Sequence, residues 1–284
     1  TDLPGFTKCL KIDCTTADTS VASGDLFMLR STFEGQDVQH YKKGTSEAQG
    51  WVLSYYIKVD GGPFTGTAEL NDSQNGRHVN ANFTATNTWQ RISHFFPADS
   101  SGTLDNDNTD TLRVNWHFMA GSTFSGGSIQ SAWASRSNSN TAPGTDNFFS
   151  STDNNIYLTG IQLEAGDTLT AFENEPVERT LTKCQRYYEE IKVVASTNSL
   201  CGPVAVGQDI SGRKCIGPYV YKTEKRAAPT IANVTIGIDA GDTTHSFVFS
   251  TGTHTTSGSS TTSTNIGEAD GLENSFDIVI DADF

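Results

Sequence analysis

The chain of 284 residues lacks any long apolar segment. No run approaches the roughly 18 apolar residues that a membrane-spanning helix needs, so membrane insertion is not expected. No signal-peptide pattern follows Thr1. We therefore expect either a trimmed chain or one whose true N-terminus is absent.

Positive charge is scarce. The chain has 19 Lys and Arg against 33 Asp and Glu, which gives a formal net charge of −14. Such a chain repels phosphate backbones and anionic lipid head groups, so nucleic acid is not an expected partner.

Cysteine is also sparse, and its spacing forms no motif. Zinc sites need C-x-x-C pairs or histidines at set intervals, and neither occurs. An odd number of cysteines excludes a complete disulfide framework, although one bridge remains possible. Reduced thiols in a protein folded in a cytosol are the expectation. The five residues are Cys9, Cys14, Cys184, Cys201 and Cys215.

Hydrophobic residues make up only 35% of the chain, while Gly, Ser, Thr, Asn and Asp are abundant. This composition favours many short strands joined by polar turns over a helical bundle or a large α/β core. The length predicts one large domain or two medium ones.

Alternation of apolar and polar residues locates the strands. In residues 51–59 (WVLSYYIKV) the odd positions are apolar and predict the buried face. The same pattern in 112–119 directs Leu112, Val114, Trp116 and Phe118 inward. Further strands are predicted at 6–14, 27–33, 65–70, 78–83, 89–96 and 156–163. A long loop at 120–153 is expected to be anchored by Trp133, Phe148 and Phe149.

The segment 154–191 joins two units. A strand at 156–163 is broken at Gly166, and Leu181, Cys184, Tyr188 and Ile191 then recur at helical spacing over about three turns. We expect this stripe to pack the second unit against the first. In the second unit strands are predicted at 192–195, 213–223, 229–238, 246–250 and 276–280, with an exposed, mobile low-complexity loop between Ser250 and Asn265.

Several phrases carry a family resemblance. The series IYLTGIQLEAGDTLTAFE followed by LTKCQRYYEEI resembles the junction in bacteriophage tail-fibre and related virion proteins. The earlier TWQRISHFFPAD, followed by IYLTGIQLEAG, is similar to the late strands of carbohydrate-binding modules. In the phage proteins a carbohydrate-binding-module-like jelly roll precedes a small C-terminal β domain. The resemblance implies an all-β chain: a jelly-roll-like β sandwich over residues 1–175, one short helix at the junction, and a β-rich domain over 176–284. TEKRAAPTI is similar to the family's Met-Arg-x-x-Pro-Thr step, with Lys225 where an apolar residue is usual.

The resemblance also implies a function. It predicts a structural component of a tailed-phage virion, on the tail or capsid exterior and assembled in the host cytoplasm. A tail-fibre or receptor-binding protein that engages host surface glycan is the leading interpretation, with a homotrimer and other virion proteins as partners. The alternatives are a capsid-decorating or head-fibre protein, a carbohydrate-binding module of a secreted enzyme, and a depolymerase.

Catalytic and metal motifs are not evident. No G-x-S-x-G elbow or Gly-rich phosphate loop occurs, and the acids sit mostly in turns, so no catalytic residue and no enzyme activity are predicted. Asp105 and Asp107 alternate in LDNDNTDT, which suits calcium, but the EF-hand glycine and glutamate are missing. Glu164 ends a core strand and is a further candidate ligand. No cofactor or metal site is therefore predicted, and a structural calcium at these residues is the alternative.

A glycan site is predicted from the alternation of side chains between the two faces of each strand. If Leu112 and Val114 face the core, the alternate residues of that strand face away from it. Residues of the 51–59 strand on the corresponding face could complete one concave, polar surface. Of the four tryptophans, three sit in strand patterns that bury them, and Trp133 is expected to be the freest. The predicted glycan-binding residues are Tyr56, Lys58, Arg113, Asn115, His117 and Trp133.

Overall fold

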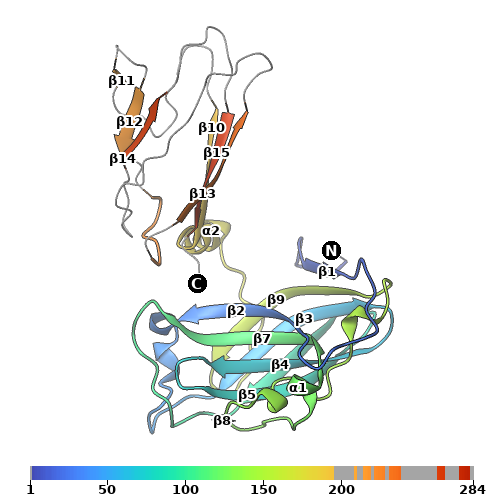
Figure 1. Cartoon of the computed structure of the whole chain (residues 1–284). Helices are drawn as coiled ribbons and strands as arrows, with labels where there is room; N and C mark the ends of the chain where they lie inside the picture. The colour runs from blue at the N-terminus through green and yellow to red at the C-terminus, as the bar shows by residue number, and fades with distance from the viewer. Residues whose placement is uncertain are drawn as a thin grey trace. The chain divides into compact units, whose positions relative to one another are not determined.

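A computed structural model describes residues 2–194, 208–209, 214–218, 221–227, 230–237, 261–265 and 275–281, with side chains for 2–189 and 221–227. The chain divides into two compact units, Thr1–Glu173 and Asn174–Phe284 (Figure 1). The boundary expected after residue 175 lies close to this division.

Unit 1 is the predicted all-β sandwich of jelly-roll type, built from two antiparallel sheets (Figure 1). Sheet A has the strand order β1 (Leu10–Asp13), β9 (Asn155–Ala165), β3 (Trp51–Asp60) and β6 (Gln90–Phe96). Sheet B has the order β2 (Leu26–Glu34), β7 (Asp110–Ala120), β4 (Phe64–Asp72), β5 (Arg77–Ala85) and β8 (Ala134–Ser135). The strands predicted at 65–70 and 78–83 correspond to β4 and β5, which form an antiparallel pair.

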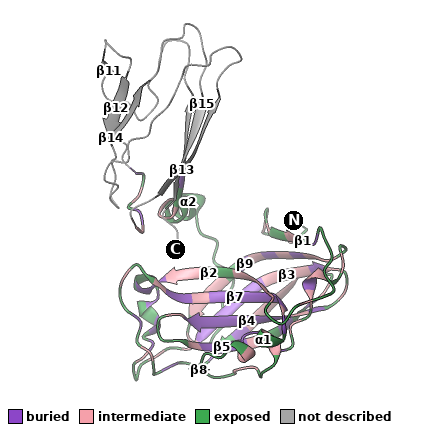
Figure 2. Cartoon of the chain, viewed as in Figure 1, coloured by how far each residue is buried: buried purple, intermediate pink, exposed green. Residues whose placement is uncertain are grey.

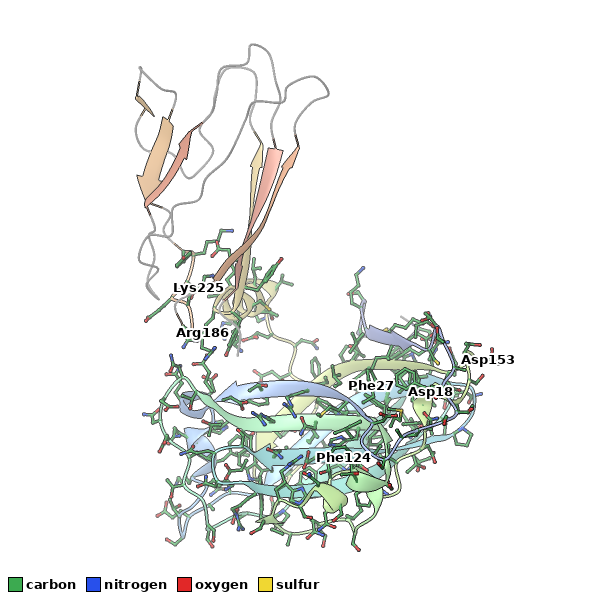
Figure 3. All side chains as sticks on the ribbon, in the orientation of Figure 1. Asp18, Phe27, Phe124, Asp153, Arg186 and Lys225 are labelled. Carbon is green, nitrogen blue, oxygen red and sulfur yellow. The ribbon has the colours of Figure 1, made fainter. Side chains whose placement is uncertain are left out.

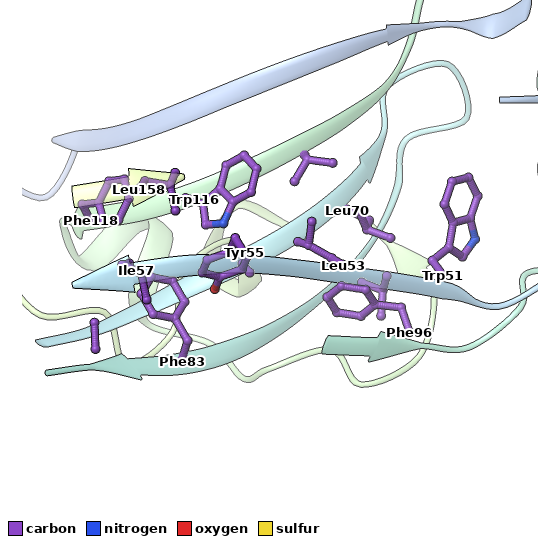
Figure 4. Packing of buried hydrophobic residues seen from close by; sticks show 14 of the residues in the cluster. Trp51, Leu53, Tyr55, Ile57, Leu70, Phe83, Phe96, Trp116, Phe118 and Leu158 are labelled. Atoms are coloured by element: carbon purple, nitrogen blue, oxygen red, sulfur yellow. The ribbon is translucent and has the colours of Figure 1, made fainter. Parts of the chain in front are cut away.

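The core fills the space between the inner faces of the two sheets (Figure 4). Trp51 and Trp116 are fully buried, as the alternation predicted. Tyr41 stacks on Trp51 with ring centroids 3.5 Å apart, and Tyr55 meets Trp116 edge to face at 5.6 Å. Because each large apolar side chain contributes about 1.5–3 kcal/mol when buried, these contacts dominate the packing of the sandwich.

One polar pair lies inside this apolar core. The Tyr55 hydroxyl is 3.0 Å from His94 Nε2, and both side chains are buried. Burial lowers the pKa of His94 to about 4, since the interior disfavours the charged imidazolium. His94 is therefore neutral at physiological pH.

The segment 120–153 is more ordered than the predicted loop. It contains α1 (Ser122–Ser125), β8 and two short 3-10 helices, Asn138–Asn140 and Phe148–Ser150. Phe148 is fully buried and Phe149 meets Phe27 at 4.9 Å, which confirms their anchoring role. Trp133 is only 9% exposed and donates its indole N–H to the Pro97 carbonyl at 2.9 Å. The expectation that Trp133 is the freest tryptophan is wrong, because that hydrogen bond and core packing hold it.

A buried ion cluster ties together the loops at one end of the sandwich. These loops include the 3-10 helices Gly35–Asp37 and Gln39–Tyr41. The Lys43 ammonium lies 2.6 Å from Asp72 and 3.1 Å from Asp99, and Asp99 also accepts from Arg77 at 2.8 Å. Each charge thus has an opposite charge beside it, which burial requires.

Unit 2 begins with α2 (Val177–Gln185), followed directly by β10 (Tyr188–Val194). β10 pairs with β15 (Ser275–Asp281), which pairs with β13 (Thr230–Gly237). A second sheet joins β11 (Gln208–Asp209), β12 (Lys214–Pro218) and β14 (Thr261–Asn265). β14 corrects the prediction of a loop up to residue 265, because its backbone pairs with β12. The strand predicted at 246–250 lies outside the described residues.

The single helical stripe predicted across Leu181, Cys184, Tyr188 and Ile191 is wrong. Leu181 and Cys184 lie on α2, whereas Tyr188 and Ile191 lie on β10 and pair with Asp281 and Ile278 of β15. Residues 188–194 form a strand despite their helical spacing of apolar residues, because β10 pairs along its whole length with β15. Leu181 and Tyr188 are about half exposed in the chain, and their proposed role in packing the two units together stays a prediction.

Lys225 is buried in the place where the family resemblance leads one to expect an apolar side chain. It is 1% exposed, and its ammonium lies 2.9 Å from Glu189, donates to the Gln185 carbonyl and sits over the Tyr221 ring. Figure 3 shows Lys225 beside Arg186. The backbone N–H of Arg226, which follows Lys225, donates to the Arg186 carbonyl. Glu189 is thus the countercharge that permits a lysine at this buried position.

Replacing Gly160 with alanine is expected to destabilise unit 1 by about 2–4 kcal/mol. Gly160 lies in a bulge of β9 at φ +58°, and an added Cβ would approach Phe6 and Tyr56 ring carbons to 2.8 Å. Urea denaturation followed by tryptophan fluorescence measures this loss, because all four tryptophans lie in unit 1.

The matched control is Gly24→Ala, since a Cβ at Gly24 meets nothing within 4 Å. Its free energy of unfolding should change by less than about 0.5 kcal/mol. Equal losses in the two variants would contradict the role assigned to Gly160.

Candidate functional site

The six predicted glycan-binding residues do not form one surface. Tyr56 and Lys58 lie on β3 of sheet A, whereas Arg113, Asn115 and His117 lie on β7 of sheet B. The inner faces of the two sheets meet in the core, so their outer faces look in opposite directions. The expectation of a shared concave patch is therefore wrong. Trp133, the sixth residue, is a core anchor.

Asn115 and His117 are also not solvated. They are 1% and 0% exposed, respectively, and both contact Glu69 of β4, which is itself fully buried (Figure 2 shows β4 and β7 largely in the buried colour). Glu69 Oε2 lies 2.7 Å from Asn115 Nδ2 and 3.1 Å from His117 Nε2. Its Oε1 lies 2.8 Å from His78 Nδ1 on β5. The outer face of sheet B thus carries a buried polar cluster.

The cluster is closed by the segment 120–153. Asn80 of β5 donates to the Asn140 carbonyl at 2.7 Å and accepts from the Gln130 backbone N–H at 2.7 Å. Thr67 of β4 contacts Thr145 at 2.9 Å. These hydrogen bonds join a polar loop to a polar sheet face. Both are buried, and most of their polar groups have a hydrogen-bond partner.

Glu69 is held as a carboxylate. Burial by itself would raise its pKa, but hydrogen bonds from His117, His78 and Asn115 outweigh burial and lower the pKa well below its usual range. His78 Nε2 and His117 Nδ1, the far nitrogens of the two rings, have no hydrogen-bond partner within the part of the chain that the structure describes.

Tyr56, on the outer face of sheet A, is covered by the ends of unit 1. Phe6 lies 5.1 Å from the Tyr56 ring and 5.1 Å from Phe172. Tyr56 is consequently a packing residue in this structure, while the Lys58 side chain is partly exposed.

Lys58 belongs to a cross-strand row of alternating aromatic and cationic side chains. Trp89 directly precedes β6, Lys58 is on β3, Tyr157 on β9 and Lys11 on β1. The strand registers pair Tyr157 with both Lys58 and Lys11, and the Lys58 ammonium lies over the Trp89 ring. The Lys58 ammonium lies 5.7 Å from the Trp89 ring centroid and 4.9 Å from that of Tyr157. We call these four residues the aromatic–lysine row.

Acidic side chains fix the geometry of the row. Asp2 accepts from the Trp89 indole N–H and pairs with Lys58 at 3.2 Å. Asp60 accepts from the Tyr157 hydroxyl at 2.9 Å, and this hydrogen bond, with burial, raises the pKa of Tyr157. Both rings are half-buried, so each keeps part of its surface exposed while its polar group is bonded.

A hollow adjoins the row at Asp60. It has a volume of about 290 Å³, and several of the residues that line it have amide or carboxylate side chains. Aromatic surface next to such groups is the chemistry that recognises sugars, because C–H faces stack on rings and hydroxyls take directed hydrogen bonds. The polar lining residues are Asp60, Asp146, Asn147, Ser150 and Asn154.

Sequence reasoning missed Trp89, Tyr157 and Lys11. The signal was present, because in a strand at 156–163 the apolar Ile156 and Leu158 share one face and Tyr157 must then point away from it. Trp89 was placed in the core, but it precedes β6 and shares the outward direction of Arg91. Which strands adjoin one another was not readable from the sequence, and the row depends on that adjacency.

The candidate acid and metal residues are held in local hydrogen bonds. Glu164 contacts the Thr170 hydroxyl at 2.5 Å; burial would raise its pKa, but bonds from Thr170 and Gln162 lower it overall. Asp107 accepts from the Thr109 backbone and hydroxyl, and Asp105 is exposed. Among the described residues no group of three or more His, Cys, Asp or Glu is arranged to hold a metal ion. In the same residues no helix has the length and apolarity to cross a membrane.

Comparison with known proteins identifies no family for this chain. No family model matches the sequence, and no curated protein matches it. Solved structures that resemble it include one described as "CBM4 structure and function", at 9% identity and a TM-score of 0.29, covering 55% of this chain and 69% of that chain. A likeness at this level carries no argument about fold or function.

Replacing Glu69 with glutamine is expected to lower the stability of unit 1 by about 1–3 kcal/mol at pH 7, because charge-assisted bonds to buried donors are lost. The lowered pKa of Glu69 means that its contribution is fully present above about pH 4.5, its ordinary pKa, and is lost as the pH falls further. The difference between wild type and Glu69→Gln should therefore shrink below pH 4.5, as measured by tryptophan-monitored urea denaturation.

Thr84→Ala, at an exposed position of the neighbouring strand β5, is the control and should behave as wild type at every pH. A difference between wild type and Glu69→Gln that stays constant from pH 7 to pH 3 would contradict an ionised Glu69.

Proposed function

We propose that this chain is a structural component of a tailed-phage virion, a tail-fibre or receptor-binding protein that binds host surface glycan without catalysis. The observation that carries glycan binding is the aromatic–lysine row, with its half-exposed Trp89 and Tyr157 rings fixed by Asp2 and Asp60. The virion role is supported by the resemblance of the junction phrases in residues 156–191 to phage fibre proteins.

Binding at the row follows from its geometry. Neighbouring strands are about 4.8 Å apart, so four strands space the row over roughly 14 Å, enough for a short oligosaccharide lying across them. Sugar rings stack on Trp89 and Tyr157, and the polar groups of the adjoining hollow take hydrogen bonds from hydroxyls. Because both rings are already held by hydrogen bonds, little side-chain freedom is lost on binding.

Two alternatives share this site. A capsid-decorating or head-fibre protein would use the row in the same way, and only its position on the particle differs. A carbohydrate-binding module of a secreted enzyme would also bind glycan here, but the resemblance of the junction favours the virion protein. The proposed location is accordingly the virion exterior.

We further propose a homotrimer, with other virion proteins as partners. Several apolar side chains of unit 2 are exposed in the single chain: Val177 is 81% exposed and Leu181 53%. Association of copies would remove such surface from water.

Replacing Trp89 with alanine is expected to weaken glycan binding by tenfold or more, since loss of a stacked ring removes about 1–3 kcal/mol. A glycan array with the purified chain identifies the ligand, and titration calorimetry then compares wild type with the variant. The expected result is loss of affinity with unchanged urea denaturation.

Phe95→Ala is the matched control. Phe95 is a 56% exposed ring on the same face of β6, about 20 Å from Trp89 along the strand. Its affinity should equal that of wild type. If Phe95→Ala weakened glycan binding and Trp89→Ala did not, the binding site would lie away from the row. Absence of binding to any glycan would overturn the proposed function.

The trimer is tested by analytical ultracentrifugation over a range of chain concentrations. We expect a species of three times the 30.6 kDa chain mass that dissociates and unfolds together in mild denaturant. A stable, folded monomer at all concentrations would contradict it.

A further inference from the structure

A buried lysine contacts two carboxylates at the loop end of the sandwich. The Lys43 ammonium lies 2.6 Å from Asp72 Oδ2 and 3.1 Å from Asp99 Oδ2. The side chains of Lys43 and Asp72 are 0% exposed, and that of Asp99 is 5% exposed. The Trp133 ring covers the same ammonium, with its centroid 4.9 Å from Nζ. Bulk water is therefore excluded from the point where the amine and the Asp72 carboxylate meet.

The preceding lysine offers a comparison within the same loop. Lys42 lies 2.7 Å from Glu47, nearly the same distance, but these side chains are 50% and 72% exposed. Among the ion pairs of the described side chains, Lys42 contacts one carboxylate and Lys43 contacts two. The Ser101 and Gly102 carbonyls, each 2.9 Å from Lys43 Nζ, further fix the position of the buried amine. Burial and a second carboxylate, rather than distance, distinguish Lys43.

The other oxygen of Asp72 faces hydrogen-bond donors. Asp72 Oδ1 accepts from the Asn75 backbone N–H at 2.8 Å and from the Asn75 side-chain amide at 3.2 Å. The same amide nitrogen lies 3.0 Å from Oδ2. Donors in these positions stabilise the negative charge that develops on Oδ1 when a nucleophile adds to the carboxyl carbon. The Asp72 carboxyl group thus has a nucleophile on one side and oxyanion donors on the other.

Asp99 is an ionised carboxylate beside the amine. Arg77 donates to both of its oxygens, at 2.8 Å and 3.1 Å, and the Ser101 backbone N–H donates at 3.0 Å. Burial would raise the pKa of Asp99, but hydrogen bonds from Arg77, Ser101 and Lys43 outweigh burial and lower it. A carboxylate in contact with Lys43 Nζ can accept one of its protons, which leaves the neutral amine that is the nucleophilic form.

We propose that Lys43 and Asp72 condense to form an intramolecular isopeptide bond, with Asp99 as the catalytic proton acceptor and donor. This modification goes beyond the proposed glycan binding and does not depend on it. The bond ties the loop that follows the 3-10 helix Gln39–Tyr41 to the end of β4.

The reaction balances within the cluster. Lys43 Nζ gives a proton to Asp99 and forms a bond to Asp72 Cγ, and negative charge develops on Oδ1. The bond between Cγ and Oδ2 then breaks. Oδ2 leaves as water with two of the three ammonium protons, which Asp99 relays, and the third proton stays on the amide nitrogen. The step consumes one cation and one anion and needs no oxidant, reductant or further reactant.

Burial favours the neutral product. The amide replaces the Lys43–Asp72 ion pair, while Arg77 and Asp99 remain as a balanced pair. A hydrogen-bonded amide costs less to bury than two charges. Folding also fixes the amine against the carboxyl group, which gives the two groups a high effective concentration.

Mass spectrometry of the denatured full chain tests the inference, because an amide survives denaturation and an ion pair does not. The mass of wild type should be lower by one water than the mass of its 30.6 kDa sequence. Fragmentation of a protease digest should place the bond between Lys43 and Asp72. An unmodified mass for the folded wild-type chain would overturn the inference, whatever the variants do.

Two variants assign the roles. Lys43→Met lacks the amine and Asp99→Asn lacks the proton acceptor, so both should keep the full mass of their sequences. Lys42→Met is the matched control and should lose one water as wild type does, because the exposed Lys42–Glu47 pair forms no bond. A loss of water that persists in Lys43→Met, or one that persists in Asp99→Asn, would overturn the assignment. Neither result bears on glycan binding, so the two proposals fail separately.

Discussion

Sheet B is buried on both of its faces, and this constraint determines most of unit 1. Its inner face packs Trp116 and its neighbours against sheet A, while its outer face places Glu69 and two histidines beneath the segment 120–153. An apolar face is satisfied by contact alone, but a buried polar face requires a partner for nearly every donor and acceptor. Glu69 meets much of that requirement, because its two oxygens serve donors from β5 and β7.

This two-sided burial also decides where a ligand can bind. The segment 120–153 covers the polar outer face of sheet B, so Asn115 and His117 are buried and stabilise the sandwich instead of contacting solvent. On the outer face of sheet A, the half-buried rings of Trp89 and Tyr157 keep part of their surface accessible.

Unit 2 obeys the same rule on a smaller scale. Lys225 occupies a buried position, and Glu189 lies 2.9 Å from its ammonium. A buried lysine is tolerated at this position because the Glu189 carboxylate is close enough to pair with it. The pair links the 221–227 turn to the start of β10, so it joins segments that are distant in the sequence.

The amino-acid sequence by itself determined the all-β class, most strand positions and the inward faces of β3 and β7, because period-two alternation is a local property. It also identified the anchoring residues Phe148 and Phe149. Only the tertiary structure decided that Tyr56 and His117 lie on opposite sheets, that Tyr188 begins a strand, and that Trp89, Lys58, Tyr157 and Lys11 form one row. Each of these depends on which strands pair and on what covers each face. Pairing joins residues far apart in the chain, and no local pattern encodes it.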